Sequence, residues 1–321
     1  MISPERAQLD QLAAAAVGTA LDGGRQGFRV WRERCRRQTE SGSQLLETRV
    51  GAFECVVEGE GRPVIVLHGL GGGYDHALWI GRRLGLTRRH QVIAISRPGY
   101  LRTPLASGGT PHLLADGLTA LLDVLGLERA GVIGSSAGGM GAIRFAIRHP
   151  DRCLGVVMLG GVAKGVWPAR LAAPIPLSHL SDLVNWAFTC SPRLRPWLSP
   201  LFWWALSGDR RRLQTLRRSP ALQLTYTEML ATTVPAGTRA AGRAADLLAV
   251  ARFPRRPDAE SPMPALVLHA PRDPAVPFSH ARVACQWFRR AVLVTVPDGR
   301  HLLPLTHPHL GRVISRFLSH A

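Results

Sequence analysis

The stretch VIGSSAGGMG, residues 132–141, decides how the rest of this chain is interpreted. It contains the pattern G-x-S-x-G, with Ser136 at its centre between Gly134 and Gly138. Apolar residues precede the pattern as in a short buried strand, and residues 142–149 have the apolar spacing of a helix. A sharp strand-to-helix turn of this kind exposes its central side chain, and it needs glycines because the strand and helix backbones nearly touch. The stretch therefore predicts a reactive serine at position 136, and a glycine-rich loop without chemistry is the alternative.

The composition predicts an ordinary folded core and gives no sign of a nucleic-acid partner. With 321 residues, 46% of them hydrophobic, the chain can form one large α/β domain or two smaller ones. Its net charge of +18 comes almost entirely from arginine, because Lys164 is the single lysine. The arginines are spread along the chain and no nucleic-acid-binding motif accompanies them. We therefore attribute the charge to a compositional bias of the coding genome, and binding to nucleic acid or an anionic membrane is the alternative.

The cysteines and the apolar runs predict a cytoplasmic protein. The five cysteines are odd in number and show no C-x-x-C spacing, which disfavours both a disulfide framework and a zinc site. No apolar run reaches the length of a membrane span. An apolar stretch at residues 12–21 follows Glu5 and Asp10, whereas a signal peptide carries net positive charge there. We expect a short helix at this stretch, and secretion is the alternative.

Residues 1–44 look like a basic helical extension that precedes the main domain. Arginines between positions 25 and 37 are interleaved with Phe28, Val30 and Trp31. We expect a helix whose charged side is solvated. A basic amphipathic anchor is the alternative, so peripheral membrane contact through this segment stays open.

From Leu45 onward, predicted strands and helices alternate. This rhythm predicts a mostly parallel sheet with helices on both faces, in which ligands bind at the carboxyl ends of the strands. We expect antiparallel edge strands at 46–50 and 53–58, buried strands at 63–67, 91–95, 131–133, 153–159, 264–269 and 291–296, and helices at 110–127, 279–289 and 310–320, with Thr110 as the cap of the first.

Residues 161–262 interrupt this alternation. They contain prolines, helical patches and many aromatic residues, and they are far longer than a simple crossover requires. We expect a helical insertion that forms a cap over the site and selects the substrate with its apolar inner face. A packed subdomain is the alternative, and the two are compatible. The predicted organisation is an extension at 1–44, a core at 45–160 and 263–321, and a cap at 161–262.

Two further side chains follow strand ends at the same edge of the sheet as Ser136. They are Asp273 and His301, each placed just after a predicted strand. A serine hydroxyl needs an imidazole to take its proton, and the imidazole needs a carboxylate to fix its tautomer and stabilise its charge. The order Ser136, Asp273, His301 therefore predicts a catalytic triad. Asp298 is a rival acid, but it lies in the loop of His301, where it is poorly placed to reach the far ring nitrogen.

The glycine-rich loop HGLGGG, residues 68–73, supplies the remaining part of the predicted site. A tetrahedral intermediate needs two donors for its oxyanion, and we expect these to be the backbone amides of Leu70 and Ala137. Predicted substrate contacts are Gly69, Gly71, Tyr74 and Ser135, and Asp75 and His76 are further candidates for lining the pocket.

These motifs resemble the α/β-hydrolase fold family, in the form that carries a helical cap. The resemblance begins at about Leu45 and implies an eight-stranded, mostly parallel sheet and a Ser-His-Asp mechanism without cofactor or metal. Serine at position 136 disfavours the epoxide hydrolase and haloalkane dehalogenase branches, which have aspartate there. The absence of a tryptophan soon after His301 disfavours a carbon–carbon bond hydrolase. The matching motifs are HGLGGG at 68–73, SRPGYLRT at 96–103, GSSAGG at 134–139, HAPRDPAVP at 269–277, and DGRH at 298–301, where many relatives have G-G-H.

The sequence therefore predicts a serine hydrolase that cleaves a small or medium apolar carboxylic ester through an acyl-enzyme. An acyltransferase with the same triad is one alternative, and a non-hydrolytic ligand-binding protein on the same fold is another. The expected partner is a small-molecule ester or acyl substrate, and the expected assembly is a monomer or homodimer.

Overall fold

The computed structural model describes residues 24–166 and 219–321, together with Asp182, Trp186 and Gln214. The chain divides into two compact units. One comprises residues 42–173 and 238–321 and contains the sheet, and the other comprises residues 1–41 and 174–237. Both ends of the predicted insertion, up to residue 173 and from residue 238, thus belong to the unit of the sheet. That the insertion caps a site stays a prediction.

The larger unit is built on one eight-stranded sheet with the order β1-β2-β4-β3-β5-β6-β7-β8. The first two pairs, β1 with β2 and β2 with β4, are antiparallel, and all the other pairs are parallel. This confirms the predicted α/β fold class and its mostly parallel sheet. The strands are β1 (Gln44–Thr48), β2 (Gly51–Glu58), β3 (Arg62–Leu67), β4 (His90–Ile95), β5 (Ala130–Ser135), β6 (Cys153–Leu159), β7 (Ser261–His269) and β8 (Phe288–Thr295).

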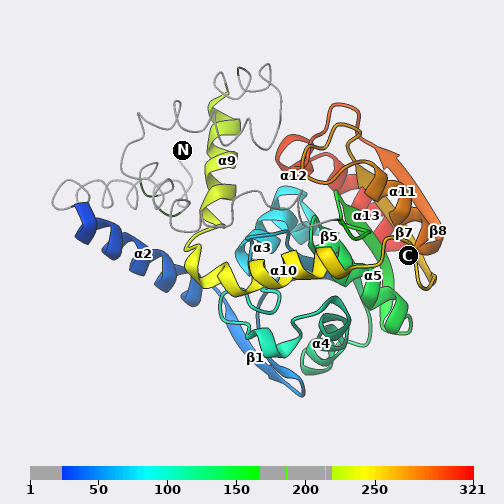
Figure 1. The fold of residues 1–321 in the computed structure, drawn as a ribbon, viewed down its shortest axis with the longest axis horizontal. Helices are drawn as coiled ribbons and strands as arrows, with labels where there is room; N and C mark the ends of the chain where they lie inside the picture. The colour runs from blue at the N-terminus through cyan, green and yellow to red at the C-terminus, as the bar shows by residue number, and fades with distance from the viewer. Residues whose placement is uncertain (1–23, 167–181, 183–185, 187–213, 215–218) are drawn as a thin grey trace. The chain divides into compact units, whose positions relative to one another are not determined.

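Helices cover both faces of the sheet (Figure 1). The alternation of side chains along β3 shows the two cores that result. Ile65 and Leu67 pack into one core, while Val64 and Val66 pack into the other. The first core is closed by α4 (Pro111–Val124), α5 (Gly138–Arg148) and α11 (Ser279–Gln286), and the second by α3 (Tyr74–Arg83) and α13 (Leu310–His320). Two more helices of this unit are α10 (Ala240–Arg252) and α12 (Leu303–Thr306).

Local signals placed these strands and helices, but several predicted ends are wrong: the helix predicted at 110–127 ends at Val124, and the strand predicted at 46–50 ends at Thr48. Thr110 caps α4 as predicted, because its hydroxyl accepts a hydrogen bond from the amide of Leu113 at 3.2 Å. The predicted helix 279–289 is wrong at its end, because α11 stops at Gln286 and Phe288 already pairs with Ser261 of β7. Pairing with the neighbouring strand overrides the helical spacing at this point.

The smaller unit contains α2 (Gly24–Ser41) and α9 (Pro220–Ala231). Arg36 of α2 donates hydrogen bonds to Glu33 and Glu40, so part of the basic charge of the N-terminal segment is paired within the helix. The predicted short helix at 12–21 lies outside the described residues. No helix in the part of the chain that the structure describes is long and apolar enough to cross a membrane. Peripheral membrane contact, a cytoplasmic location and a monomeric or dimeric state stay predictions.

Candidate active site

Ser136 occupies a strained turn between β5 and α5. Its φ angle is 50°, in the left-handed region that residues other than glycine rarely adopt. Its neighbours hold this backbone from both sides: its amide donates to the carbonyl oxygen of Leu159 at 3.2 Å, and its own carbonyl oxygen accepts from the amides of Val162 and Gly139 at 2.8 and 3.0 Å. A strained residue persists only where its surroundings determine it this fully, and such residues cluster at functional sites.

The glycines around Ser136 are required by close backbone approach, as the sequence predicts. A Cβ atom on Gly134 would lie 2.7 Å from the Cα atom of Gly139, and one on Gly138 would lie 2.4 Å from the carbonyl oxygen of Leu67. A Cβ atom on Gly69 would lie 2.9 Å from the Cβ atom of Ser136. The glycine-rich loop after β3 therefore passes directly beside the serine side chain.

A continuous chain of hydrogen bonds joins Ser136, His301 and Asp273. The Nε2 atom of His301 lies 3.0 Å from the Oγ atom of Ser136, and its Nδ1 atom lies 2.9 Å from the Oδ2 atom of Asp273. Asp273 follows β7 and His301 follows β8, so both come from the carboxyl edge of the sheet at which β5 presents Ser136. Asp298, the rival acid, is exposed, and it is Asp273 that bonds to the imidazole.

The carboxylate of Asp273 is buried and held in its charged form. Its Oδ1 atom accepts hydrogen bonds from the amides of Ala275 and Val276 at 2.8 and 2.9 Å. Burial alone would raise the pKa of Asp273, but the hydrogen bond from His301 and these two amides outweigh it, so the pKa is lowered. The Nε2 atom of His269 donates to the carbonyl oxygen of Val276 at 2.8 Å, which fixes the same turn.

The peptide between Gly69 and Leu70 is anchored by His68. Burial, reinforced by the charge of Arg97, holds the pKa of His68 well below its usual value, so this imidazole is neutral. Its Nε2 atom accepts from the amide of Arg97 at 3.0 Å, and the proton therefore sits on Nδ1, which donates to the carbonyl oxygen of Gly69 at 2.8 Å. Because the N–H of a trans peptide points opposite to its C=O, the amide of Leu70 is directed away from His68.

Neither of the two predicted oxyanion donors is occupied elsewhere. Within the described ranges, the amides of Leu70 and Ala137 have no hydrogen-bond acceptor in the protein. Ala137 precedes α5, whose first amides lack intrahelical partners. Gly69, which precedes Leu70, packs against Ser136, and Ala137 follows Ser136 in the chain. The amides of Leu70 and Ala137 therefore belong to the surroundings of the serine side chain.

The other predicted residues lie around the same loop. The amide of Gly71 donates to the hydroxyl of Tyr100 at 3.4 Å, and Ser135 is the last residue of β5. The phenol of Tyr74 is buried and hydrogen-bonded to Ser43, and burial raises its pKa to about 12. That Gly69, Gly71, Tyr74 and Ser135 contact substrate stays a prediction.

Asp75 and His76, the further lining candidates, lie in the first turn of helix α3. Asp75 forms an ion pair with the buried guanidinium of Arg239 at 2.7 Å. Burial, followed by the charges of Arg239 and His301, lowers the pKa of His76 to about 4, so its imidazole is neutral near pH 7. Within the described ranges, no group of three or more His, Cys, Asp or Glu side chains is placed to hold a metal ion.

Sequence reasoning missed a buried cluster beside the glycine-rich loop, formed by Arg97, Tyr100 and Asp246. The motif SRPGYLRT contains the first two, but its spacing does not indicate an acidic partner on a distant helix. The guanidinium of Arg97 meets both carboxylate oxygens of Asp246, at 2.5 and 2.6 Å. The signal that could have been used is an arginine two residues after the end of the buried strand β4, where a charge needs a partner.

The family relationship agrees with this geometry. A sequence model described as the alpha/beta hydrolase fold matches residues 62–308 of the chain. The chain therefore belongs to the α/β-hydrolase fold family.

One relative in sequence is named as a hydrolase. The chain is 26% identical over 269 residues to 2-hydroxymuconate semialdehyde hydrolase from Pseudomonas sp. (strain CF600), a match that covers 82% of this chain and 89% of the relative. Among solved structures, an alpha/beta hydrolase fold protein from Nakamurella multipartita has a TM-score of 0.75 and 28% identity, covering 86% of this chain and 98% of the other. A thermophilic esterase from Thermogutta terrifontis has a TM-score of 0.62 at 23% identity over 87% of this chain and 98% of its own, which shows a shared fold.

Proposed function

We propose that this chain is a serine hydrolase that cleaves small or medium apolar carboxylic esters through an acyl-enzyme. One observation carries the proposal: the hydroxyl of Ser136 lies 3.0 Å from an imidazole nitrogen of His301, whose other nitrogen lies 2.9 Å from the carboxylate of Asp273. This is the arrangement that turns a weakly nucleophilic hydroxyl into an effective one. The name of a hydrolase among its relatives supports hydrolysis as the reaction class. The specificity for esters is part of the proposal.

Each of the three groups has a defined role in the proposed acylation step. As the Oγ atom of Ser136 attacks the ester carbonyl, its proton passes to Nε2 of His301, and Asp273 stabilises the imidazolium that forms. The amides of Leu70 and Ala137 donate to the oxyanion of the tetrahedral intermediate. Collapse of the intermediate breaks the bond to the alcohol oxygen, and His301 returns the proton to this leaving group.

Deacylation repeats the same steps with water. His301 removes a proton from a water molecule that attacks the acyl carbon, and a second tetrahedral intermediate forms at the same two amides. Its collapse releases the carboxylic acid, while Ser136 recovers its proton from His301. An acyltransferase differs only in the attacking molecule, which is another alcohol or a thiol in place of water.

An apolar substrate is supported by the exposed side chain of Leu70. This side chain is 49% exposed, although Gly69 just before it packs against the Cβ atom of Ser136. A large apolar side chain exposed beside a reactive serine is a suitable contact for the apolar part of an ester.

A series of p-nitrophenyl esters of increasing acyl length tests the proposal, with Ser136→Ala as the control. We expect saturable release of p-nitrophenol that the Ser136→Ala variant lacks. Adding competing alcohols or thiols and analysing the products separates hydrolysis from acyl transfer. The absence of turnover with every ester in folded protein would contradict the proposal and would favour a non-hydrolytic ligand-binding protein.

A further inference from the structure

The buried cluster of Arg97, Tyr100 and Asp246 ties helix α10 to the loop that carries the predicted oxyanion donor. Asp246 lies on α10, whereas Arg97 and Tyr100 lie in the segment after β4. All three side chains are at least nine-tenths buried. The hydroxyl of Tyr100 donates to the Oδ2 atom of Asp246 at 2.5 Å, next to the Nη2 atom of Arg97 at 2.6 Å from the same oxygen.

The protonation states of the cluster are fixed by this packing. Burial disfavours the charge of Arg97, but the ion pair with Asp246 outweighs it and the pKa of Arg97 is raised. Burial and the charge of Asp246 hold the pKa of Tyr100 well above its usual value, so the phenol keeps its proton and donates it. Removing the carboxylate would leave a buried guanidinium without its counter-ion, which is strongly unfavourable.

The same cluster holds the peptide groups on both sides of Leu70. The Nη2 atom of Arg97 donates to the carbonyl oxygen of Gly69 at 3.3 Å, and this carbonyl shares its peptide plane with the amide of Leu70. On the other side, the amide of Gly71 donates to the hydroxyl of Tyr100 at 3.4 Å. Asp246 is hydrogen-bonded to both of these side chains, the donor Arg97 and the acceptor Tyr100, but to neither peptide group itself.

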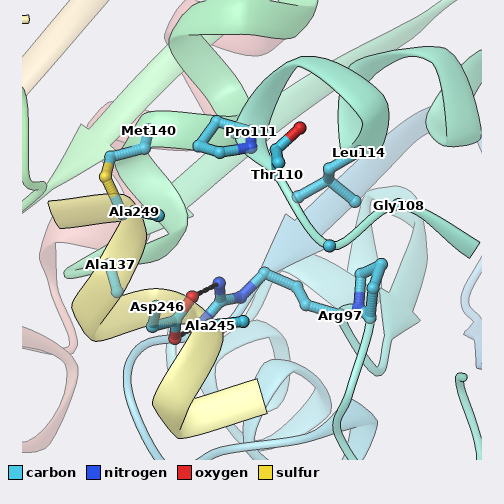
Figure 2. Close-up of a pocket in the computed structure, with 13 residues that line it drawn as sticks. Arg97, Gly108, Thr110, Pro111, Leu114, Ala137, Met140, Ala245, Asp246 and Ala249 are labelled. Atoms are coloured by element: carbon cyan, nitrogen blue, oxygen red, sulfur yellow. Dashed lines mark hydrogen bonds and ion pairs between the residues drawn. The ribbon is translucent and has the colours of Figure 1, made fainter. Parts of the chain in front are cut away.

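Helix α10 is seated closely enough to hold Asp246 in place. The amide of Gly242 donates to the carbonyl oxygen of Gly99 at 2.8 Å, and a Cβ atom on Gly242 would lie 2.1 Å from the ring of Tyr100. Figure 2 shows that Asp246 on α10 meets Arg97. Both residues line a cavity that Ala137 also lines. Ala245, Asp246 and Ala249 of α10 line this cavity together with Ala137 and Met140, so α10 and the turn after Ser136 border the same space.

We propose that Asp246 is a positioning residue for the oxyanion donor at Leu70, acting through Arg97 and Tyr100. The inference rests on the proposed function, because a positioned donor matters only where an oxyanion forms. It makes the docking of α10 a condition for catalysis, beyond the contribution of the ion pair to stability. An oxyanion donor that is displaced, and not removed, is expected to cost less than the 10²–10³-fold of a full deletion.

Asp246→Asn tests the inference, with Asp258→Asn, a more exposed carboxylate, as the control. Asp258 also pairs with a buried arginine through both carboxylate oxygens, Arg144 at 2.7 Å, on a different part of the core. For Asp246→Asn we expect kcat for a p-nitrophenyl ester to fall by about 10- to 100-fold with KM within about threefold of wild type. When the serine hydroxyl adds to the carbonyl carbon of a trifluoromethyl ketone, the ketone oxygen becomes an oxyanion. Affinity for such a ketone should therefore fall by a similar factor. The Asp258→Asn variant should keep both values.

Tyr100→Phe provides a second test that keeps the ring and the ion pair. It removes the hydroxyl that joins Asp246 to the amide of Gly71, and we expect a smaller loss in kcat and in ketone affinity, again with little change in KM. If Asp246→Asn does not fold, Tyr100→Phe decides. A folded variant with unchanged kcat and ketone affinity, in an otherwise active wild type, overturns this inference alone. A wild type without ester turnover overturns the proposed function and this inference with it.

Discussion

The Oγ atom of Ser136 and the Nε2 atom of His301 lie 3.0 Å apart, although the two residues are 165 positions apart in the sequence. Removing either group should therefore abolish ester hydrolysis. We expect Ser136→Ala and His301→Gln each to lower kcat by about 10⁴-fold or more, because the two groups act as a unit. The thermal unfolding midpoint should change little. Initial-rate kinetics with circular-dichroism melts checks this, and an active Ser136→Ala variant would refute the assigned nucleophile.

The acid of the site can be identified by comparing two aspartates. Asp273→Asn should lower kcat by about 10³- to 10⁴-fold, since an amide at this position favours the wrong imidazole tautomer. The kcat of Asp298→Asn should stay within about twofold of wild type, because Asp298 is exposed and the imidazole of His301 is hydrogen-bonded to Asp273. Steady-state kinetics on both variants decides. A larger loss for Asp298→Asn would exchange the two assignments.

The turn around Ser136 should not tolerate a side chain on its flanking glycines. In Gly138→Ala the new Cβ atom would lie 2.4 Å from the carbonyl oxygen of Leu67, a backbone atom that cannot move aside. We expect the free energy of unfolding to fall by about 2–3 kcal/mol. Gly126→Ala is the comparison: its Cβ atom meets open space, but φ is +67°, so a loss of about 1 kcal/mol is expected. Urea titration measures both, and equal losses would argue against close approach at the turn.

Acid should weaken the fold through buried neutral histidines. Burial, followed by the charges of Lys164 and His269, lowers the pKa of His280 to about 4 in the folded protein, against about 6.5 in the unfolded chain. The unfolded state thus binds the proton first as pH falls, so the stabilisation is complete above about pH 6.5 and is lost below it.

His280 alone should therefore lower the free energy of unfolding by about 1 kcal/mol when the pH falls from about 7.5 to about 5.5. In His280→Gln this pH-dependent loss should shrink by that amount, whatever the variant does to stability at neutral pH. The exposed His320→Gln serves as the control. Urea titrations at the two pH values provide the measurement. If His280→Gln lost as much unfolding free energy between the two pH values as the wild type, this imidazole would not be buried as described.

The parts of the molecule that follow from local patterns were predictable. Ser136, Asp273 and His301 each follow a strand end, and parallel strands bring such positions to one edge of a sheet. Gly134 and Gly138 were predictable for a similar reason, because a strand-to-helix turn imposes close contact wherever it occurs.

Features that depend on tertiary packing were not predictable. The sequence contains Arg97 and Asp246, but nothing local indicates that they meet, because the meeting depends on how Gly242 seats α10 against Tyr100. The end of α11 at Gln286 was missed for the same reason, since it is set by the pairing of β8 with β7. A local pattern in one sequence does not indicate which distant residues will meet in the fold.

Covalent labelling with a fluorophosphonate probe tests the central claim most directly, because the probe requires an activated serine and no knowledge of the natural substrate. We expect stoichiometric phosphonylation of the folded wild-type protein, with the modified peptide mapping to Ser136, and no labelling of Ser136→Ala. Labelling at Ser135 or at any other residue, or no labelling of well-folded protein, would contradict the account.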